Sequence, residues 1–514
     1  MNVGRRWQEP VALGVCAAVL LGCAAAPFVA LIGEGQHADA YALLSAGSTW
    51  SLLARSLAIA GAVTSLAVVI GVPLGVLLGR SDVGARRLAL FVHVFPMFLP
   101  PFLLALGWFH VLGQSGALGT RATAGVLFAP AGLVVVLALA FAPIVSSLTL
   151  LGLDAIDPSL IDAARLVARP PRVIARILVP IAWPAIVLAA LVVFALAFSE
   201  LGVPMFLRVR VYPAAVFARL GGVDYAPGEA FALVLPQLAV GALILGLERR
   251  VMRRRSLTVL GLRREQPAFA LGRWWPVATI LCWAIALLGL VPIAALAARA
   301  SWRELGPWIG SSVGNTLIDG ALAATVIAAC GIVVGRGLAR GQLAARALDA
   351  LALLAFVAPS AVLGAGLIAV WNRPETQVVY ATSAIVVVGY VARYAILGTR
   401  PIAIALARST VALEDAAANV GAGYFRRLVR IVIPIHARTV VAAWLLALVF
   451  CLRDLETTVL YYPPGGETLL VQIFGLEANG KPSVIAGLAM LHVAITAGVV
   501  ALGLVLLRGR TRAP

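Results

Sequence analysis

Charge is scarce in this sequence. Only 12% of its 514 residues are Asp, Glu, Lys or Arg, whereas 62% are hydrophobic and the mean hydropathy is +1.01. A water-soluble fold must cover much of its surface with polar groups, and this chain has too few of them. The composition therefore excludes a soluble enzyme or binding domain and indicates a protein embedded in a membrane.

Cysteine and histidine are also scarce, with five of each. No cysteine forms a CxxC pair, the histidines are scattered, and no HExxH pattern is present. We therefore expect no metal site. The sequence also contains no nucleophile–base constellation that would support an intramembrane enzyme. We expect a transport subunit rather than an enzyme.

Lysine occurs once, as Lys481 within GLEANGKP (475–482). This segment fits the GxxxxGK pattern of a phosphate-binding loop, but Pro482 stands where a magnesium-binding Ser or Thr belongs. Because no other lysine is available, the chain cannot build a nucleotide site of this type elsewhere. We expect no cofactor in this chain, and any ATP hydrolysis must be carried out by a separate subunit.

Long apolar runs predict membrane-spanning helices, since about 20 helical residues cross roughly 30 Å of hydrocarbon. Twelve runs recur, at residues 11–32, 54–79, 88–112, 125–149, 181–205, 229–247, 276–298, 315–338, 347–371, 381–401, 437–459 and 484–507. The start of the chain imitates a lipoprotein signal, but the spans that follow make 11–32 the first of them. The sequence predicts an all-α polytopic membrane protein with about 12 transmembrane helices.

Arginine clusters account for most of the net charge of +18 and lie in short segments between apolar runs. The positive-inside rule places these segments in the cytoplasm, and with them both termini, including Arg5 and Arg6. No compact basic domain exists to bind nucleic acid, so we expect none as a partner. The expected location is a bacterial inner membrane, with the lipid bilayer as the surrounding solvent.

The two halves of the chain share residues at constant spacing. Three positions recur at an offset of 260 residues (331 − 71 = 260): Gly71 with Gly331, Gly75 with Gly335, and Arg80 with Arg340. We predict two parallel six-helix repeats, related by an axis along the membrane normal. The first covers residues 1–247, the second covers residues 276–514, and residues 248–275 form a basic cytoplasmic linker.

Each half carries an amphipathic cytoplasmic loop between its fourth and fifth spans, within 150–180 and 402–434. The second loop contains DAAANVGAGYFRRLVRIVIP (415–434), in which a glycine permits a left-handed turn and a proline starts the next helix. The first contains DAARLVARPPRVIARILVP (162–180), which is one residue shorter and has alanine in place of that glycine. Two short helices joined at a turn would dock into a groove on a soluble partner.

These loops resemble the EAA loop of permease subunits of ATP-binding-cassette (ABC) importers. The residues that fall on this pattern are Asp415, Ala416, Ala417, Gly421, Ile431 and Pro434 in the second loop, and Asp162, Ala163, Ala164, Ala168 and Pro180 in the first. Over the whole chain, the two fused halves resemble the double-length permeases of the ferric-iron importer family, to which thiamine and aminoethylphosphonate importers are related.

The resemblance implies several partners and a function. A type I importer has two copies of a cytoplasmic ABC ATPase, which bind ATP and magnesium, and an extracytoplasmic solute-binding protein. This chain would form the solute pathway, with ferric iron as the expected solute and thiamine, aminoethylphosphonate or a polyamine as alternatives. A major-facilitator-type secondary transporter, which also has two parallel six-span halves, is the alternative from another class.

Ionisable residues in membrane spans usually face the protein interior. Glu200 and Asp454 each lie 20 residues after the proline that ends the loop of their half (200 − 180 and 454 − 434). We expect them to face each other and, with Glu456, to line or gate the outer vestibule; Arg393 is a further candidate. The alternative is that these acids cap helix ends or pair with nearby Arg208 and Arg210.

Overall fold

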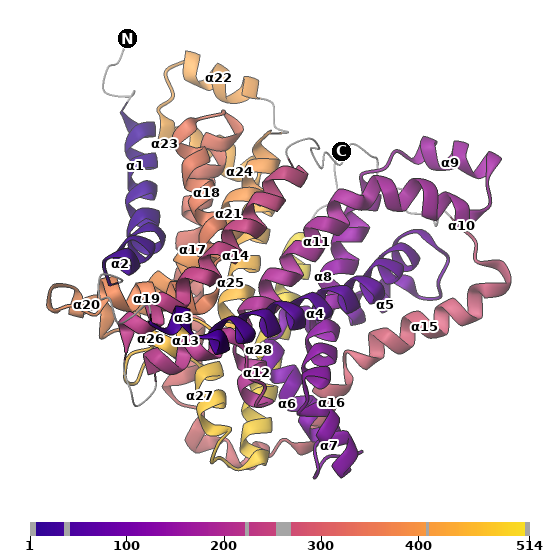
Figure 1. Cartoon of the computed structure of the whole chain (residues 1–514). Coiled ribbons are helices and arrows are strands. Elements are labelled where there is room, and N and C mark those ends of the chain that lie inside the picture. The colour runs from indigo at the N-terminus through magenta and orange to yellow at the C-terminus, as the bar shows by residue number, and fades with distance from the viewer. Residues whose placement is uncertain (1–6, 35–41, 222–225, 253–268, 408–410, 509–514) are drawn as a thin grey trace.

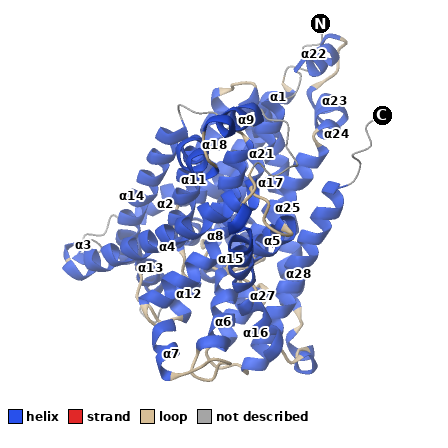
Figure 2. Ribbon diagram, turned by 90° about the vertical axis from the view of Figure 1, so that its right-hand side faces the viewer, coloured by secondary structure: helices blue, strands red, loops and turns tan. Residues whose placement is uncertain are grey.

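The computed structural model describes residues 7–34, 42–221, 226–252, 269–407 and 411–508. These residues form helices joined by short loops (Figures 1 and 2), and the extended pairing recorded among them is a bridge between Ser81 and Phe269. The predicted all-α fold is confirmed. Arg5 and Arg6, and residues 253–268 of the predicted linker, lie outside the described residues.

The same order of elements occurs twice along the chain. Up to residue 252 the α-helices are α1 (Gln8–Leu20), α2 (Ala26–Glu34), α3 (Ala42–Ser45), α4 (Gly47–Arg80), α5 (Arg86–Val94), α6 (Pro101–Leu112), α7 (Arg121–Leu127), α8 (Pro130–Asp154), α9 (Pro158–Val167), α10 (Pro170–Val173), α11 (Val179–Ser199), α12 (Gly202–Phe206), α13 (Tyr212–Gly221) and α14 (Pro227–Met252). Beyond it they are α15 (Trp275–Leu288), α16 (Val291–Arg299), α17 (Ser311–Ala339), α18 (Leu343–Val357), α19 (Ser360–Trp371), α20 (Gln377–Tyr380), α21 (Ala384–Ala407), α22 (Val411–Asn419), α23 (Tyr424–Arg427), α24 (Ile433–Ile435), α25 (Ala437–Leu452), α26 (Thr458–Tyr461), α27 (Leu469–Leu476) and α28 (Pro482–Arg508).

Eight of the described helices are long and apolar enough to cross a membrane, and four bent helix pairs bring the number to 12 if each pair is one span. The predicted count of about 12 is therefore reached only with the bent pairs. Two of the predicted spans end too late. The span expected at 181–205 ends at Ser199, and the one expected at 437–459 ends at Leu452. In both places the chain leaves the helix before the buried acidic residues.

Prolines produce the two sharpest bends. The chain turns by 105° between the segments Arg86–Phe98 and Pro101–Leu112, and by 112° between α18 and α19. Leu99 and Ala358, which precede prolines, are extended, with ψ of 150° and 138°. A residue before proline is pushed out of the helical region, and proline cannot donate the next helical hydrogen bond. The breaks bring loop backbone into the centre of the helix bundle.

Matched glycines lie where matched helices cross. A Cβ on Gly71 of α4 would lie 2.7 Å from the carbonyl oxygen of Ala142 in α8, and one on Gly331 of α17 would lie 2.6 Å from that of Gly398 in α21. Only glycine lets these backbones approach so closely. The crossings agree with the repeats predicted from the sequence, whereas the repeat boundaries and the symmetry axis stay a prediction.

The first helical segment of each half packs against the other half. α2 lies against α19, and α16 lies against α6. These contacts also pass over glycines: a Cβ on Gly366 would lie 2.5 Å from the Pro27 oxygen, and one on Gly107 would lie 2.3 Å from the Pro292 oxygen. The two halves are therefore interlocked by an exchange of helices rather than placed side by side.

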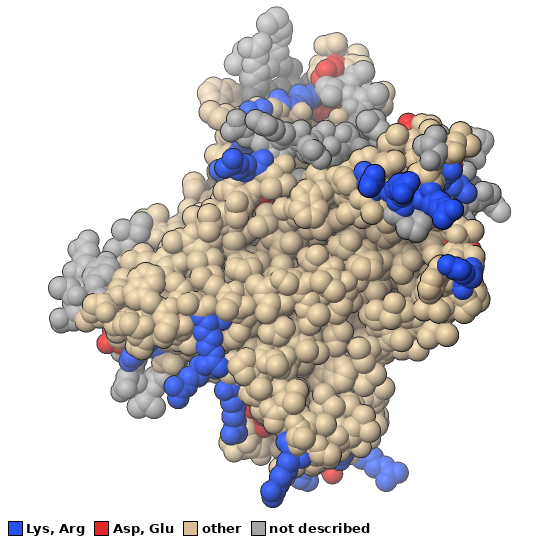
Figure 3. Space-filling view, turned by 45° about the vertical axis from the view of Figure 1, so that its right-hand side comes forward, with Lys and Arg blue, Asp and Glu red and all other residues tan. Residues whose placement is uncertain are grey.

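The two predicted loops lie at the same end of the molecule. Helices α9, α22 and α23 are at the upper end in Figures 1 and 2, where α1 also begins, whereas α7 and α16 are at the lower end. On the face shown in Figure 3, Lys and Arg gather toward the upper and lower ends, with a broad uncharged band between them. This distribution suits a molecule that crosses a bilayer between its two ends.

Candidate functional site

A cluster of ionisable side chains lies where α11 and α25 end. Glu200 and Asp454 follow these helices and are buried, with 4% and 3% of their surface exposed. The hydroxyl of Ser360, at the start of α19, donates a hydrogen bond to the carbonyl oxygen of Ser199 (3.0 Å). The cluster is therefore built at the junction of helix ends and the bent helix pairs of both halves.

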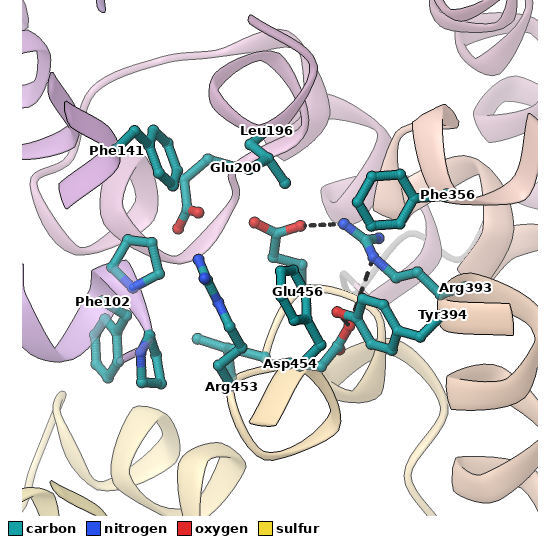
Figure 4. A pocket seen from close by; sticks show the side chains of 14 residues that line it. Phe102, Phe141, Leu196, Glu200, Phe356, Arg393, Tyr394, Arg453, Asp454 and Glu456 are labelled. Atoms are coloured by element: carbon teal, nitrogen blue, oxygen red, sulfur yellow. Dashed lines mark hydrogen bonds and ion pairs between the residues drawn. The ribbon is translucent and has the colours of Figure 1, made fainter. Parts of the chain in front are cut away.

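Arg393 of α21 joins the two acidic residues of the second half. Its Nη2 lies 2.8 Å from Oε2 of Glu456, and its Nε lies 3.6 Å from Oδ2 of Asp454. The hydroxyl of Tyr394 donates a hydrogen bond of 2.5 Å to the same Asp454 oxygen. Figure 4 shows these side chains converging on one point. Buried charges are tolerated when they are paired and hydrogen-bonded in this way.

The acidic side chains also cap short helices. Oδ1 of Asp454 accepts hydrogen bonds from the backbone and hydroxyl groups of Thr457 and Thr458, at 2.6 to 3.3 Å. Oε1 of Glu200 accepts one from the backbone N–H of Val203 at 3.2 Å. The capping role that the sequence left open is thus present. The recorded ion pairs of Asp454 and Glu456 are with Arg393, and not with Arg208 or Arg210, which the alternative interpretation named.

A second guanidinium, that of Arg453, completes the cluster. Its Nη1 donates to the carbonyl oxygen of Met97 at 2.6 Å, and Figure 4 shows its head group close to the carboxylate of Glu200. The side chains enclose a cavity of about 30 Å³. That volume holds one or two water molecules and no larger solute. In this conformation the four predicted residues and Arg453 form a closed junction, which is held by ion pairs of Arg393 and by hydrogen bonds.

Sequence reasoning selected Glu200, Asp454, Glu456 and Arg393, and the structure brings all four together. It did not select Tyr394, whose hydroxyl holds Asp454. The signal available in the sequence was the position of Tyr394 directly after an arginine within an apolar run. Apolar lining residues of both halves surround the polar groups, among them Pro100, Phe102, Phe141, Leu196, Phe356 and Phe450.

The second predicted loop consists of α22, a turn and α23. Gly421 at the turn has φ of +84°, the left-handed conformation that the sequence predicted. Asp415, Ala416 and Pro434 are exposed, and Ala417 and Ile431 are half-buried. These positions leave one face of the elbow available to a partner.

Buried Arg336 fastens this loop to the membrane-spanning helices. It pairs with Glu414 of α22 at 2.8 Å and with Glu9 of α1 at 3.0 Å, and its guanidinium lies 4.7 Å from the ring centroid of Tyr424. Arg340 adds a contact of 2.9 Å to the same Glu414. A movement of α22 would therefore be transmitted to α17 and α1.

The first predicted loop has a different turn. α9 ends before Ala168, which is extended with φ of −145°, and α10 begins at Pro170. Ala163 and Pro180 are exposed, Asp162 is half-buried, and Ala164 is buried. The loop reaches a similar elbow through extended Ala168 and a new helix that begins at Pro170, instead of through a left-handed glycine.

The start of α9 is stabilised by its own cap. The Asp157 carboxylate accepts a hydrogen bond of 2.8 Å from the backbone N–H of Ser159. This hydrogen bond favours the ionised form and holds the pKa of Asp157 below its ordinary value. At the base of the loop, Arg80 pairs with Asp154 at 3.3 Å.

A π-helical turn lies near the end of each loop, at Ile174–Leu178 and Leu428–Val432. Both precede the prolines that end the loops, Pro180 and Pro434. Since proline cannot donate to the carbonyl four residues earlier, the turn before it is free to widen. These matched turns were not predicted from the sequence.

The segment 475–482 joins α27 to α28 as a helix-to-helix turn, and not as the strand-to-helix loop that binds phosphates in P-loop proteins. Among the residues that the structure describes, no three His, Cys, Asp or Glu side chains are grouped to hold a metal ion.

Two sets of relatives share part of this sequence. The chain is 30% identical over 182 residues to the molybdenum transport system permease protein ModB of Mycobacterium tuberculosis and of Mycobacterium bovis, a match that covers 35% of this chain and 69% of the relative. It is 37% identical over 84 residues to a protein named as a 2-aminoethylphosphonate transport system permease, PhnV, of Salmonella paratyphi A. That match covers 16% of this chain and 32% of PhnV. No protein-family model matches the chain.

Fold and site together define an integral membrane protein with several helical spans around a buried polar junction. The chain belongs to the permease subunits of ABC transporters.

Proposed function

We propose that this chain is the membrane-embedded permease of an ABC importer, coupled to ATP hydrolysis through its two elbow loops. In this proposal two copies of a cytoplasmic ATPase bind the loops, supply the ATP and magnesium sites, and drive the pathway between inward- and outward-facing states. The observation that carries it is the pair of helix–turn–helix elbows, each placed before the equivalent span and both at one end of the molecule (Figure 1).

The proposal includes the setting of the protein. The chain would lie in a bacterial inner membrane with both termini in the cytoplasm, and a solute-binding protein would dock at the end opposite the two loops. The residues that would contact the ATPases are those on the EAA-like pattern, of which the exposed ones are Asp415, Ala416, Gly421, Pro434, Ala163 and Pro180.

Co-purification from native membranes in mild detergent tests the coupling. We expect a P-loop ATPase to accompany the parent chain and to be lost from Gly421→Arg, since arginine disfavours φ of +84° and adds bulk to the docking face. The matched control is Gly475→Arg, at an exposed helical position with open space around it. A chain recovered without any ATPase, in detergent that preserves such complexes, would favour a secondary transporter instead.

For the solute we propose ferric iron. Three carboxylates and two guanidinium groups meet in the central junction, so its formal charge is −1 if all are ionised (2 − 3 = −1). A net negative junction favours passage of a cation over an anion. The second candidate is 2-aminoethylphosphonate, which is favoured by the similarity to PhnV.

Uptake by cells that carry the complete transporter separates these solutes. We expect accumulation of radiolabelled iron, and none of 2-aminoethylphosphonate or molybdenum. Accumulation of the phosphonate without iron would replace the first candidate by the second.

The same assay tests the central junction as a gate. We expect Glu200→Gln and Asp454→Asn to change uptake at least severalfold, because each alters a buried charge at the centre of the pathway. The control is Glu304→Gln, whose side chain is 45% exposed. Normal uptake by both junction variants would leave these acids with a capping role only.

A further inference from the structure

The two halves meet at two seams, and one of them is closed by ion pairs. At this seam, which we call the latched seam, Arg400 of α21 lies 3.1 Å from Glu248 of α14 and 3.4 Å from Asp349 of α18. The last long helix of the first half is thereby tied to two helices of the second half. These contacts are partly buried, so they join the halves more firmly than exposed ion pairs would.

The matched positions on the other seam follow from three landmarks. The matched glycines Gly75 and Gly335 lie against the carbonyl oxygens of Ser146 and Thr399, which are therefore equivalent positions. The next residue in each helix is then also equivalent, so Ser147 corresponds to Arg400 (400 − 147 = 253). α14 and α28 begin at Pro227 and Pro482, so Gly503 corresponds to Glu248 (503 − 248 = 255). The bent helix pairs break at Pro100 and Pro359, so residues at the same distance before each break are equivalent, and Leu90 corresponds to Asp349 (349 − 90 = 259).

These three counterparts line a groove. Ser147, Gly503 and Leu90 all border an open space of about 580 Å³ between α5 and α8 on one side and α25 and α28 on the other. The ion-paired triad of the latched seam is thus replaced by small and apolar residues, and a groove remains at that place. Its volume falls in the range of about 300–1,000 Å³ that is typical of sites for small organic ligands.

The chemistry of the groove points to a lipid. Its lining is apolar apart from Ser147 and Arg87, and several lining residues are exposed, including Phe91 (47%) and Leu151 (54%). The four helices belong to membrane-spanning segments, so hydrocarbon is what surrounds this face in a bilayer. An acyl chain is therefore the group that suits the apolar wall.

Arg87 gives the groove a polar end. It is the second residue of α5 and is close in sequence to Arg80, whose pairing with Asp154 marks the end of the molecule that carries the two loops. Leu504 and Leu507 of the last turns of α28 line the same groove. A guanidinium matches the geometry of a phosphate, and basic residues between spans at the headgroup level recognise anionic lipid headgroups.

We propose that an anionic phospholipid occupies this groove, with an acyl chain between the two halves and its phosphate at Arg87. The lipid fills the open seam at the place where Arg400 closes the latched seam. The inference needs only that the chain lies in a bilayer, and it is independent of the solute and of the ATPase.

Native mass spectrometry of the purified full chain tests the proposal. Protein in mild detergent is titrated with phosphatidylglycerol or phosphatidylcholine, and bound lipid is counted at increasing collision energy. We expect one phosphatidylglycerol to be retained per chain, at least about tenfold more than phosphatidylcholine. Equal retention of the two lipids would overturn the assignment to an anionic headgroup.

Two variant pairs locate the site. Leu504→Trp places a large ring in the groove and is expected to abolish retention, whereas Leu502→Trp on the same helix lies outside the lining and should retain the lipid. Arg87→Gln should lose the preference for phosphatidylglycerol, whereas Arg249→Gln, on α14 at the other seam, should keep it. Retention that is equal within both pairs would overturn the proposal. A single symmetric peak in size-exclusion chromatography confirms that each variant is folded.

Discussion

Asp454 accepts hydrogen bonds on both carboxylate oxygens, and it is the residue on which the central junction most depends. Removing one partner of a buried ion pair costs about 3–5 kcal/mol, since the remaining charge is left without compensation. We expect Asp454→Ala to lower the free energy of unfolding by about this amount, measured by denaturant titration in mixed micelles.

The control for this variant is Asp162→Ala. The side chain of Asp162 is 48% exposed, and its oxygen lies 3.7 Å from Arg165. Exposed pairs contribute about 0–1 kcal/mol. Equal losses in the two variants would show that the junction is not the stabilising element inferred from its contacts.

Gly331 shows how a glycine, which has no side chain, allows two helices, α17 and α21, to cross in close contact. A Cβ there would lie 2.6 Å from backbone atoms of Gly398, which cannot move aside as a flexible side chain could. We expect Gly331→Val to cost about 1–3 kcal/mol of stability through overpacking. Gly314→Val on the same helix, where nothing lies within 4 Å, is the matched control in a thermal unfolding assay. A smaller loss for Gly331→Val than for Gly314→Val would contradict the crossing.

At the residue scale, sequence reasoning could find the residues of the junction but not which of them form ion pairs and hydrogen bonds with one another. A charged residue in an apolar run must be paired or face a polar interior, so Glu200, Asp454 and Arg393 stand out. The partner of each depends on which helices meet, and that is decided by packing over hundreds of residues. The alternative pairing with Arg208 or Arg210 considered only residues close in sequence.

Helix α22 depends on a few charged contacts with the helices beneath it. Glu414 is 14% exposed at its side chain and binds both Arg336 and Arg340. A hydrogen bond to a charged group contributes about 1.5–3 kcal/mol. We expect Glu414→Gln to speed amide hydrogen exchange in α22 by about tenfold or more, in keeping with this free energy.

Asp415→Asn provides the comparison. Its side chain is 58% exposed and lies 3.5 Å from Arg340, so its neutralisation should leave exchange in α22 nearly unchanged. If amide hydrogen exchange in α22 is equally fast in the Glu414→Gln and Asp415→Asn variants, Glu414 does not hold the loop.

The cap at the start of α9 predicts a dependence on pH. Because the pKa of folded Asp157 is lowered, the cap stabilises α9 above the ordinary carboxyl value of 3.8, and this stability is lost as pH falls through the lower folded pKa. We expect hydrogen exchange in α9, corrected for the intrinsic rate, to rise below about pH 4. Asp157→Asn keeps a capping oxygen and should remove this dependence. A variant that retains the same pH profile would exclude Asp157 as its source.

At the element scale, hydropathy located the helices but not their breaks. Pro100 and Pro359 indicated kinks, but the size of the bends, 105° and 112°, could not be predicted, since the second segment of each pair also packs against α16 or α2 of the other half. The ends of α11 and α25 were placed too late because the apolar pattern continues into α12 and α26. The left-handed turn at Gly421 was predictable because glycine alone favours it.

The exchange of α2 and α16 between halves makes a prediction for the whole molecule. A protease site placed within residues 253–268 would allow the chain to be cut between its halves. We expect the fragments to remain together in size-exclusion chromatography in mild detergent, since α2 stays on α19 and α16 stays on α6. Denaturing electrophoresis confirms that cleavage is complete. Separation of the fragments would show that the covalent link, and not the exchange, holds the halves together.

At the same scale, the two repeats were predictable from the sequence because glycine and arginine recur at a constant offset. The exchange of first helices was not, because apolar helices carry little information about which neighbour they choose. The difference between the latched seam and the groove was also hidden. It depends on three positions, among them Arg400 and Gly503, that are far apart in sequence and meet only across the interface.

The unlike turns of the two elbows have a consequence for any pair of motor subunits that binds them. One elbow pivots on Gly421 and is anchored through Arg336, while the other is extended at Ala168. Two ATPase subunits of identical sequence would no longer be equivalent once bound, because each would move an elbow loop of different stiffness. The two subunits would then act on the membrane-spanning helices one after the other, and this order would come from the asymmetry of the permease chain alone.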